Sequence, residues 1–221
     1  MEYDVLKSSA LFKGLTEAEI QAALAELEAK TKKFDKDSVI LRAGAVAREL
    51  GIVLSGGVQI EFDDFWGRKS IVNYLEAGDV FAEAYACDGN APMLVNAVAA
   101  KNSAVLFISA AQIVAAGADS SPYRQKLIKN LLMIMAQRNL QLSRRMLYTS
   151  YKTIRERLLA YLCYLALCSG GNTAAVPFNR QQLADYLHVD RSALSNEISK
   201  MQKDGLIKVN RNVFTILQPD N

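Results

Sequence analysis

Residues 191–203 carry side chains whose types and spacing suit contact with DNA. On a helix of about 100° per residue, one side of this segment is polar or basic throughout. Arginine can present two donors to guanine, asparagine can pair with adenine, and serine adapts to bases or phosphate. Glu197 and Asp204 fall on the flank of this side and not in its middle. An ordinary amphipathic hairpin with a solvated face is the alternative. With one arginine before the segment and one after it, the candidate DNA-contacting residues are Arg180, Arg191, Ser192, Ser195, Asn196, Ser199, Lys200, Lys203 and Arg211.

Two capped helices joined by a tight turn are predicted to hold these side chains. Asn179 can cap the first helix, with Gln182 at the reciprocal capping-box position. His188-Val189-Asp190 forms the connection, and Asp190 is a suitable cap for the second helix. The inward-facing apolar residues are Leu183, Ala184, Leu187, Leu194, Ile198 and Met201. This pattern predicts a helix-turn-helix.

Residues 148–221 are predicted to form one unit around this hairpin. A helix is expected over residues 153–167, and two strands over residues 206–209 and 213–217. Three helices and a terminal β-hairpin are typical of a winged helix-turn-helix. This region carries 9 Lys+Arg against 6 Asp+Glu, whereas residues 1–147 carry 17 of each. The whole net charge of +3 therefore lies here, as a polyanionic partner would require.

Short β-type runs separated by glycines follow residue 33. Before them, Thr16 and Glu19 form a capping-box pair at the start of a helix. Several short strands with glycine turns are typical of an antiparallel barrel or sandwich. The predicted strands span residues 38–41, 50–54, 58–62, 70–75 and 104–108.

A long helix is predicted from about residue 120 to about residue 147, and two apolar stripes run along it. One stripe has the alternating spacing of four and three that a coiled-coil seam shows, and it consists of Ile128, Leu132, Met135, Asn139, Leu142 and Met146. The second stripe consists of Leu127, Leu131 and Ile134. One stripe for its own domain and one left over favours a partner helix, and hence a dimer. A single broad stripe buried within one domain is the alternative that periodicity leaves open.

The composition is that of a globular protein, with 51% hydrophobic and 22% charged residues. Three cysteines leave one unpaired under any pairing, which argues against a secreted disulfide framework. The first residues, Met1-Glu2-Tyr3-Asp4, lack the features of a signal peptide. No apolar run approaches the roughly 18 residues of a membrane span. We therefore expect a soluble, cytoplasmic protein with no membrane partner.

The order of motifs along the chain resembles that of the Crp/Fnr family of transcription regulators. Besides the helix-turn-helix, the segments that carry the resemblance are residues 11–15 (LFKGL), 51–58 (GIVLSGGV), 78–83 (GDVFAE) and 152–159 (KTIRERLL). The resemblance covers nearly the whole chain. It implies an α+β fold with an antiparallel, jelly-roll β-barrel of the cyclic-nucleotide-binding-like type over residues 1–118. A long dimerisation helix over residues 119–147 and a winged helix-turn-helix DNA-binding domain over residues 148–221 would follow.

The resemblance also implies a function. It implies a sequence-specific transcription regulator that binds a palindromic operator in double-stranded DNA as a homodimer, with RNA polymerase as a further partner. By match to the family's recognition helix, Arg191, Ser192 and Asn196 would read bases. Many relatives have arginine where this chain has Asn196, so the preferred half-site is left open.

The signal that such a protein senses is constrained by residues 78–95. In relatives that bind cyclic AMP, a glutamate contacts the ribose and a following arginine neutralises the phosphate. Glu83 matches the glutamate, but residues 84–95 contain no Arg or Lys. A buried phosphate without a cationic partner is strongly disfavoured, which argues against a cyclic nucleotide.

The cysteines and the histidine exclude the family's other known cofactors. No cysteine precedes Cys87, so a four-thiolate iron–sulfur cluster cannot be built, and the single histidine, His188, lies far from the sensor region, which argues against haem and zinc. Cys87 itself is expected to be a small buried apolar residue, since no basic side chain lies near it in sequence to lower its pKa. An apolar pocket for an unknown small-molecule effector, or a sensor that has lost its ligand, remains. The candidate contact residues for such an effector are Glu83, Ala84, Cys87 and Ser143. Ser143 is included because its position on the long helix matches a place where relatives contact an effector.

Two other classes of function deserve comparison. A small-molecule-binding module whose C-terminal domain mediates protein–protein contact would share most of these features without contacting DNA. An enzyme would require a nucleophile–base pair, a Gly-rich phosphate loop or a metal cluster, and the sequence offers none. We therefore predict no catalytic and no metal-binding residues.

Overall fold

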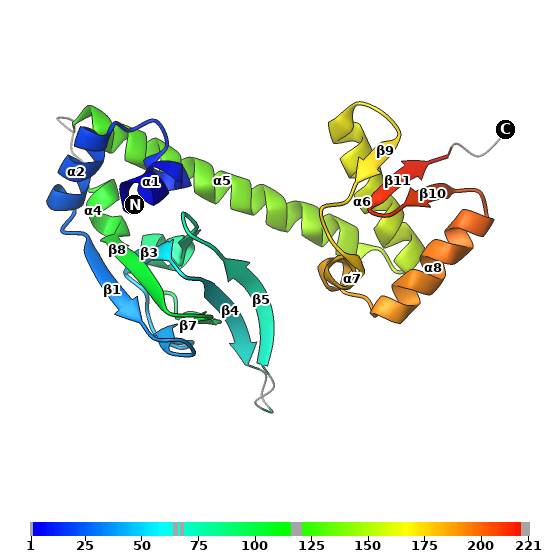
Figure 1. Cartoon of the computed structure of the whole chain (residues 1–221), viewed down its shortest axis with the longest axis horizontal. Helices are drawn as coiled ribbons and strands as arrows, with labels where there is room; N and C mark the ends of the chain where they lie inside the picture. The colour runs from blue at the N-terminus through cyan, green and yellow to red at the C-terminus, as the bar shows by residue number, and fades with distance from the viewer. Residues whose placement is uncertain (1, 64–65, 67–68, 116–120, 218–221) are drawn as a thin grey trace. The chain divides into compact units, whose positions relative to one another are not determined.

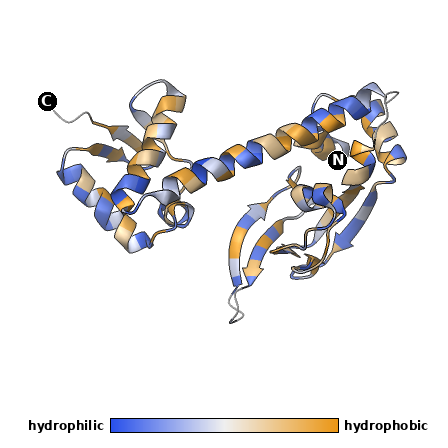
Figure 2. Ribbon diagram, turned by 180° about the vertical axis from the view of Figure 1, so that it is seen from behind, coloured by the Kyte–Doolittle hydropathy of each residue, from blue (hydrophilic) through white to orange (hydrophobic). Residues whose placement is uncertain are grey.

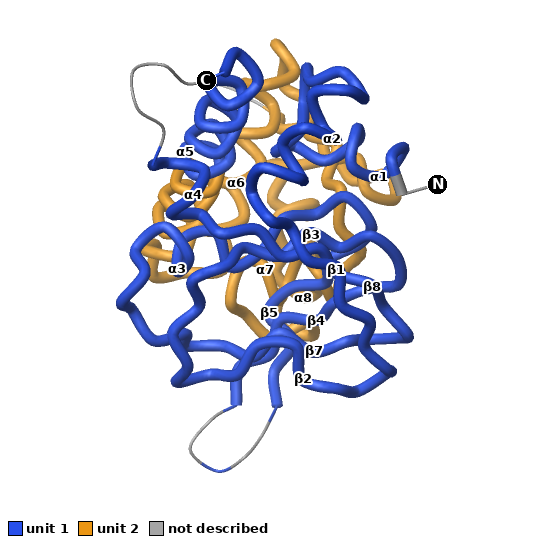
Figure 3. Tube along the Cα trace, turned by 90° about the vertical axis from the view of Figure 1, so that its left-hand side faces the viewer, with its two compact units in different colours: residues 1–137 blue, residues 138–221 orange. Residues whose placement is uncertain are grey.

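The structure, a computed structural model, describes residues 2–63, 66, 69–115 and 121–217. It divides the chain into two compact units, residues 1–137 and 138–221, which Figure 3 colours separately. The predicted long helix is confirmed as α5 (Pro122–Ser150). The division between the two units falls within it. Its expected start near residue 120, like the expected domain limit at residues 118 and 119, lies outside the described residues. The three-part division therefore stays a prediction.

The first unit contains two four-stranded antiparallel sheets (Figure 1), with strand orders β1-β8-β3-β6 and β2-β7-β4-β5. All five predicted strands are present, as β2, β3, β4, β5 and β8, and the sequence patterns missed the other three. The strands are β1 (Lys30–Phe34), β2 (Val39–Leu41), β3 (Glu49–Ser55), β4 (Val58–Asp63), β5 (Lys69–Leu75), β6 (Val80–Phe81), β7 (Asn96–Ala99) and β8 (Ser103–Ser109).

The two sheets enclose an apolar core. Phe81, Val105 and Phe107 from the first sheet pack with Val58 and Leu75 from the second. Close packing explains a glycine of the GIVLSGGV segment, because a Cβ at Gly51 would overlap the ring of Phe81. In the same segment Gly56 has φ +85°, a turn conformation that glycine adopts without strain.

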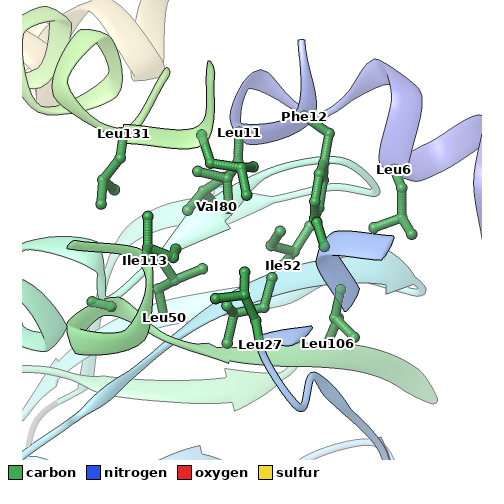
Figure 4. Close-up of a cluster of buried hydrophobic side chains, with 14 of the residues drawn as sticks. Leu6, Leu11, Phe12, Leu27, Leu50, Ile52, Val80, Leu106, Ile113 and Leu131 are labelled. Carbon is green, nitrogen blue, oxygen red and sulfur yellow. The ribbon is translucent and has the colours of Figure 1, made fainter. Parts of the chain in front are cut away.

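A second apolar core lies on the other face of the first sheet, under the helices (Figure 4). Leu50 and Ile52 of β3 and Leu106 of β8 meet Leu11 and Phe12 there. The helices of the unit, besides the first part of α5, are α1 (Glu2–Ser8), the 3-10 turn η1 (Ala10–Phe12), α2 (Glu17–Glu26), α3 (Glu83–Asp88) and α4 (Ala110–Val114). The predicted capping box of α2, between Thr16 and Glu19, is confirmed.

The first part of α5 is fixed to this unit by packing and by polar contacts. The second apolar stripe, Leu127, Leu131 and Ile134, is buried in the core under the helices. Lys126 Nζ lies 2.8 Å from Glu19 Oε1, and Asn130 Nδ2 donates to the Leu11 carbonyl at 2.8 Å. The Asn130 bond links the LFKGL segment to the long helix, and the Lys126 pair links α2 to it.

The coiled-coil stripe of α5 does not share that burial. Leu132 and Leu142 are each 66% exposed, Met146 is 71% exposed, and Asn139 is exposed as well. Figure 2, coloured by hydropathy, shows hydrophobic and hydrophilic residues alternating along this helix. The alternative of one broad buried stripe is therefore wrong: of the coiled-coil stripe, Ile128 packs against the core under the helices, whereas Leu132, Asn139, Leu142 and Met146 are exposed.

The second unit is a three-helix cluster with a small antiparallel sheet of order β10-β11-β9. The predicted helices, their caps and the terminal hairpin are confirmed, whereas β9 was not predicted. The elements are α6 (Ile154–Ser169), β9 (Thr173–Ala175), α7 (Arg180–Leu187), α8 (Arg191–Lys203), β10 (Ile207–Asn210) and β11 (Val213–Ile216). The α+β architecture predicted for the chain is thus confirmed.

Within the described residues, no helix is both long enough and apolar enough to cross a membrane.

Candidate nucleic-acid interface

Helix α8 is held by its apolar side. Leu194, Ile198 and Met201 are buried in the core of the second unit, together with Leu158 of α6 and Phe214 of β11. The predicted inward residues of α7 are buried in the same core. The opposite side of α8 is therefore turned to solvent.

The solvent-facing side of α8 brings the predicted DNA-contacting residues together. The seven of them that lie on α8 are exposed except Ser195, which is half-buried; of the other two, Arg180 on α7 is half-buried and Arg211 at the hairpin is exposed. Within the described residues, the side chains of Arg191, Asn196, Lys200 and Lys203 make no ion pair or hydrogen bond to another part of the chain. Their donors and the amide group of Asn196 are free to bind a ligand.

The serines on this side are organised differently. The Ser195 hydroxyl donates to the Arg191 carbonyl at 2.9 Å, and the Ser199 hydroxyl donates to the Ser195 carbonyl at 3.1 Å. The Ser192 hydroxyl donates to the Asp190 carboxylate at 2.5 Å. Each hydroxyl oxygen keeps lone pairs that can accept from a base or a backbone donor.

The start of α8 is fixed by Asp190, as predicted. Its carboxylate accepts from the backbone N–H groups of Ser192 at 2.8 Å and Ala193 at 3.0 Å. The hydrogen bond from the Ser192 hydroxyl, followed by these backbone bonds, lowers the pKa of Asp190 below its usual value. The ionised cap therefore holds the first turn of the helix in place.

Two arginines hold the end of α7 and the turn, and sequence reasoning did not single them out. Arg145 donates to the Asp185 carbonyl at 3.3 Å, and Arg157 donates to the carbonyls of Leu187 at 3.2 Å and His188 at 3.1 Å. His188 ends α7 in the left-handed conformation at φ 53°. Partial burial, and then the charges of Arg145 and Arg157, lower the pKa of His188, so it is neutral near pH 7. It acts as a turn residue, in keeping with its solvent-exposed place.

An aromatic cluster joins the last turns of α5 to α6 and α7. Tyr148 is buried, and its ring centroid lies 5.4 Å from that of Tyr161 and 6.5 Å from that of Tyr186. Burial raises the pKa of Tyr148 well above its usual value, with smaller contributions from neighbouring tyrosines. The only sequence signal was the aromatic content of residues 148–186, which carries no periodic pattern.

Arg180 and Arg211 meet at the wing formed by β10 and β11. The Arg180 guanidinium lies over the Phe214 ring at 4.9 Å and donates to the Arg211 carbonyl at 3.3 Å. Burial lowers the pKa of Arg180. Arg211 is exposed at the tip of the hairpin and has φ 55°. Arg180 thus supports the wing, and Arg211 is the wing's exposed cation.

The effector candidates fall on two elements. Glu83, Ala84 and Cys87 lie on α3 in the first unit, where Glu83 is buried and Ala84 is exposed. Ser143 is exposed on α5 and belongs to the second unit. A pocket of about 600 Å³ in the first unit includes none of these candidates; it is lined by Leu41, Val46, Ala47, Arg48, Glu49, Phe107 and Ser109.

The expectation that Cys87 is buried is wrong. Its side chain is exposed, because it lies on the outer side of the short helix α3. Desolvation, and then the negative charge of Glu83, raise the pKa of the thiol. A raised pKa disfavours the thiolate and so weakens redox chemistry at this position.

No group of three or more potential metal ligands occurs among residues 2–63, 66, 69–115 and 121–217.

Comparisons with known proteins identify both halves of the chain. The family model for the cyclic nucleotide-binding domain matches residues 31–118, and the model for the Crp-like helix-turn-helix domain matches residues 156–221. No curated protein matches the chain in sequence.

Solved structures share the fold over nearly the whole chain. The c-di-GMP responsive global regulator CLP of Xanthomonas campestris is 18% identical, with a TM-score of 0.56 over 92% of this chain and 100% of that one. The catabolite activator protein of Thermus thermophilus is 19% identical, with a TM-score of 0.52 over 95% and 94%. A putative cAMP-binding regulatory protein of Silicibacter pomeroyi is 20% identical, with a TM-score of 0.52 over 98% and 94%. At these identities the likeness establishes the fold.

The Asp190 cap leads to a pH-dependent prediction. Because the pKa of Asp190 is lowered, its stabilising effect is complete above the ordinary aspartate pKa and is lost as the pH falls through the lower value. Asp190→Ala should lower the melting temperature at pH 7, whereas Asp190→Asn should retain the cap without titrating. Circular dichroism melts from pH 7 to about pH 3 measure both. An identical acid-side loss in the wild type and in Asp190→Asn would contradict this assignment.

Proposed function

The chain belongs to the Crp/Fnr family of transcription regulators, and from this premise we propose that it binds a palindromic operator as a homodimer, under the control of an effector that is not a cyclic nucleotide. Binding of DNA for the regulation of transcription follows from the family. The dimer, the operator symmetry and the effector are the proposed parts. Such a protein would act in the cytoplasm, where the chromosome and RNA polymerase are its partners.

The observation that carries the proposal is the solvent-facing side of α8. On this side the described structure gives no partner to the side chains of Arg191, Asn196, Lys200 and Lys203, and a helix in the major groove requires such free groups. The acidic residues on its flank, Glu197 and Asp204, are paired with Arg155, and Asp190 at its start accepts hydrogen bonds from the first turn of the helix. A solvated surface would not need this arrangement.

Roles on α8 follow from side-chain chemistry. Arg191 at the first turn suits a bidentate contact with guanine, and Asn196 suits adenine. Ser192 is placed between them to contact a base or a phosphate. Phosphate contacts are assigned to Ser195 and Ser199 and to the exposed cations Lys200, Lys203 and Arg211, while Arg180 supports the wing.

The outer stripe of α5 supports a homodimer. Leu132, Leu142 and Met146 repeat at seam spacing and are exposed, which a helix in water does not favour. The same stripe on a second copy would cover them, with Asn139 at a seam position that sets register. A symmetric dimer presents two recognition helices, which demands two symmetric half-sites.

The sensor is proposed to respond to a small molecule other than a cyclic nucleotide. Glu83 is buried at the position that contacts ribose in cyclic-AMP-binding relatives. The described segment 84–95 provides no cation for a cyclic phosphate. The sensor's proposed contact residues are Glu83, Ala84, Cys87 and Ser143.

Selection from random duplex DNA tests the proposal. The purified, ligand-free protein should enrich a palindrome whose half-sites are about 34 Å apart, and the enrichment should fall at higher salt. If no sequence is enriched at either salt concentration, small molecules that stabilise the protein in a thermal-shift screen are added and the selection is repeated. A second failure would favour a ligand-binding module whose C-terminal domain contacts protein.

Base reading by Arg191 is tested by alanine substitution. Arg191→Ala should relax the preference at one position of each half-site and weaken binding by about 1–3 kcal/mol, because a bidentate contact is lost. Lys203→Ala is the control for a phosphate contact: it should weaken all sequences alike and reduce the salt slope by about 1. Competition binding on the selected operator and its variants measures both. An unchanged sequence preference in Arg191→Ala would refute the assignment.

The dimer seam is tested by placing a charge in it. Leu142→Glu should raise the dimer dissociation constant about a hundredfold or more. Each copy loses the roughly 1.5–3 kcal/mol of free energy gained by burying a leucine side chain. Gln141→Glu adds the same charge one residue away, off the stripe, and should leave the dimer intact. Sedimentation equilibrium gives the dissociation constants. Equal constants for the two variants would show that this stripe is not the interface.

A further inference from the structure

Two carboxylates lie on the same flank of α8. Glu197 and Asp204 are seven residues apart, which on a helix is two turns, or roughly 10.5 Å. Both lie about 100° or less around the helix from Asn196, next to the side proposed to face DNA. Left unpaired, they would repel phosphates along the recognition helix.

One guanidinium from another helix pairs with both carboxylates. Arg155 Nε, in the first turn of α6, lies 2.6 Å from Glu197 Oε1, and its second nitrogen, Nη2, lies 2.7 Å from Asp204 Oδ2. The Glu197 side chain is only 18% exposed. The two hydrogen bonds raise the pKa of Arg155 above its usual value.

This bridge has a geometry that arginine alone provides. A guanidinium is planar and offers several donors in a rigid fork, whereas a lysine ammonium is a point charge. Because side chains two turns apart converge on one fork, the bridge restrains both the position of α8 along α6 and the rotation of α8. Its charge also offsets part of the negative charge on that flank.

The charge balance of α8 shows what depends on this bridge. From Arg191 to Asp204 the segment carries three basic and two acidic residues. With the acidic pair neutralised in part by Arg155, the carboxylates weaken the attraction between the three basic residues and the DNA phosphates less. Without Arg155, two carboxylates would stand beside the phosphates.

We propose that Arg155 is a positioning residue for DNA reading: through Glu197 and Asp204 it orients α8 and neutralises the helix's acidic flank. The inference rests on the proposed function of α8. Arg155 itself is not assigned a contact with DNA.

The test compares variants on the operator selected by the wild-type protein. Arg155→Gln should bind it roughly tenfold more weakly at low salt, because like charges then face one another across the interface, and the deficit should shrink as salt screens them. The triple variant Arg155→Gln, Glu197→Gln, Asp204→Asn should recover most of the affinity, since no uncompensated carboxylate remains. Arg42→Gln, at an exposed arginine of the first unit, is the charge-matched control and should bind like the wild type.

The triple variant separates the two parts of the proposal: recovered affinity assigns the deficit to charge that is no longer neutralised, whereas a deficit that persists in a folded triple variant assigns it to the orientation of α8. Circular dichroism melts show whether each variant is folded, and the triple variant tests the idea even where Arg155→Gln melts early. Equal binding by the wild type and a folded Arg155→Gln variant would overturn the inference while leaving operator binding intact. A wild-type protein without any operator would overturn the proposed function and the inference with it.

Discussion

A helix that reads DNA must be fixed by contacts on its inward side and at its ends, because its outward side must stay free of partners within its own chain. In α8 the buried residues Leu194, Ile198 and Met201 supply that support. Packing alone fixes the depth of a helix better than its rotation, since an apolar stripe tolerates small rolls. The polar contacts at the two ends and the flank of α8 therefore decide where its free side chains point. The rest of the second unit is organised around that requirement.

Basic residues of this unit divide into two sets by what they contact. Arg145, Arg155 and Arg157 are bonded to carbonyls or carboxylates within the chain, where they fix the helix-turn-helix. Arg191 and Lys203 are not bonded in the described structure. The net charge of +3 counts paired and unpaired cations alike. It therefore does not show how much positive surface is available to a polyanion. The placement of each cation is informative where the total is not.

Local signals in the sequence predicted the local structure well. The caps at Asn179 and Asp190 act within three residues, so the sequence alone reveals them. Strand β1 was missed because its residues, KTKKF, carry lysines that protect a sheet edge and hide the strand pattern. The Arg155 bridge was missed because its partners are 42 and 49 positions away in the chain, and only the fold brings them together. Cys87 was predicted as buried from residue type, although exposure on a short helix depends on the tertiary surroundings.

Helix α5 contributes to the cores of both units, through Leu131 to the first and through Tyr148 to the second. Leu132, Leu142 and Met146 of its coiled-coil stripe are left exposed among the described residues. In the proposed dimer, such a helix would link three events: effector binding in the first unit, pairing with a second copy, and presentation of α8. An effector could favour DNA binding only by stabilising one state of this helix over another. The physical question for regulation is therefore which contacts of α5 differ between those states.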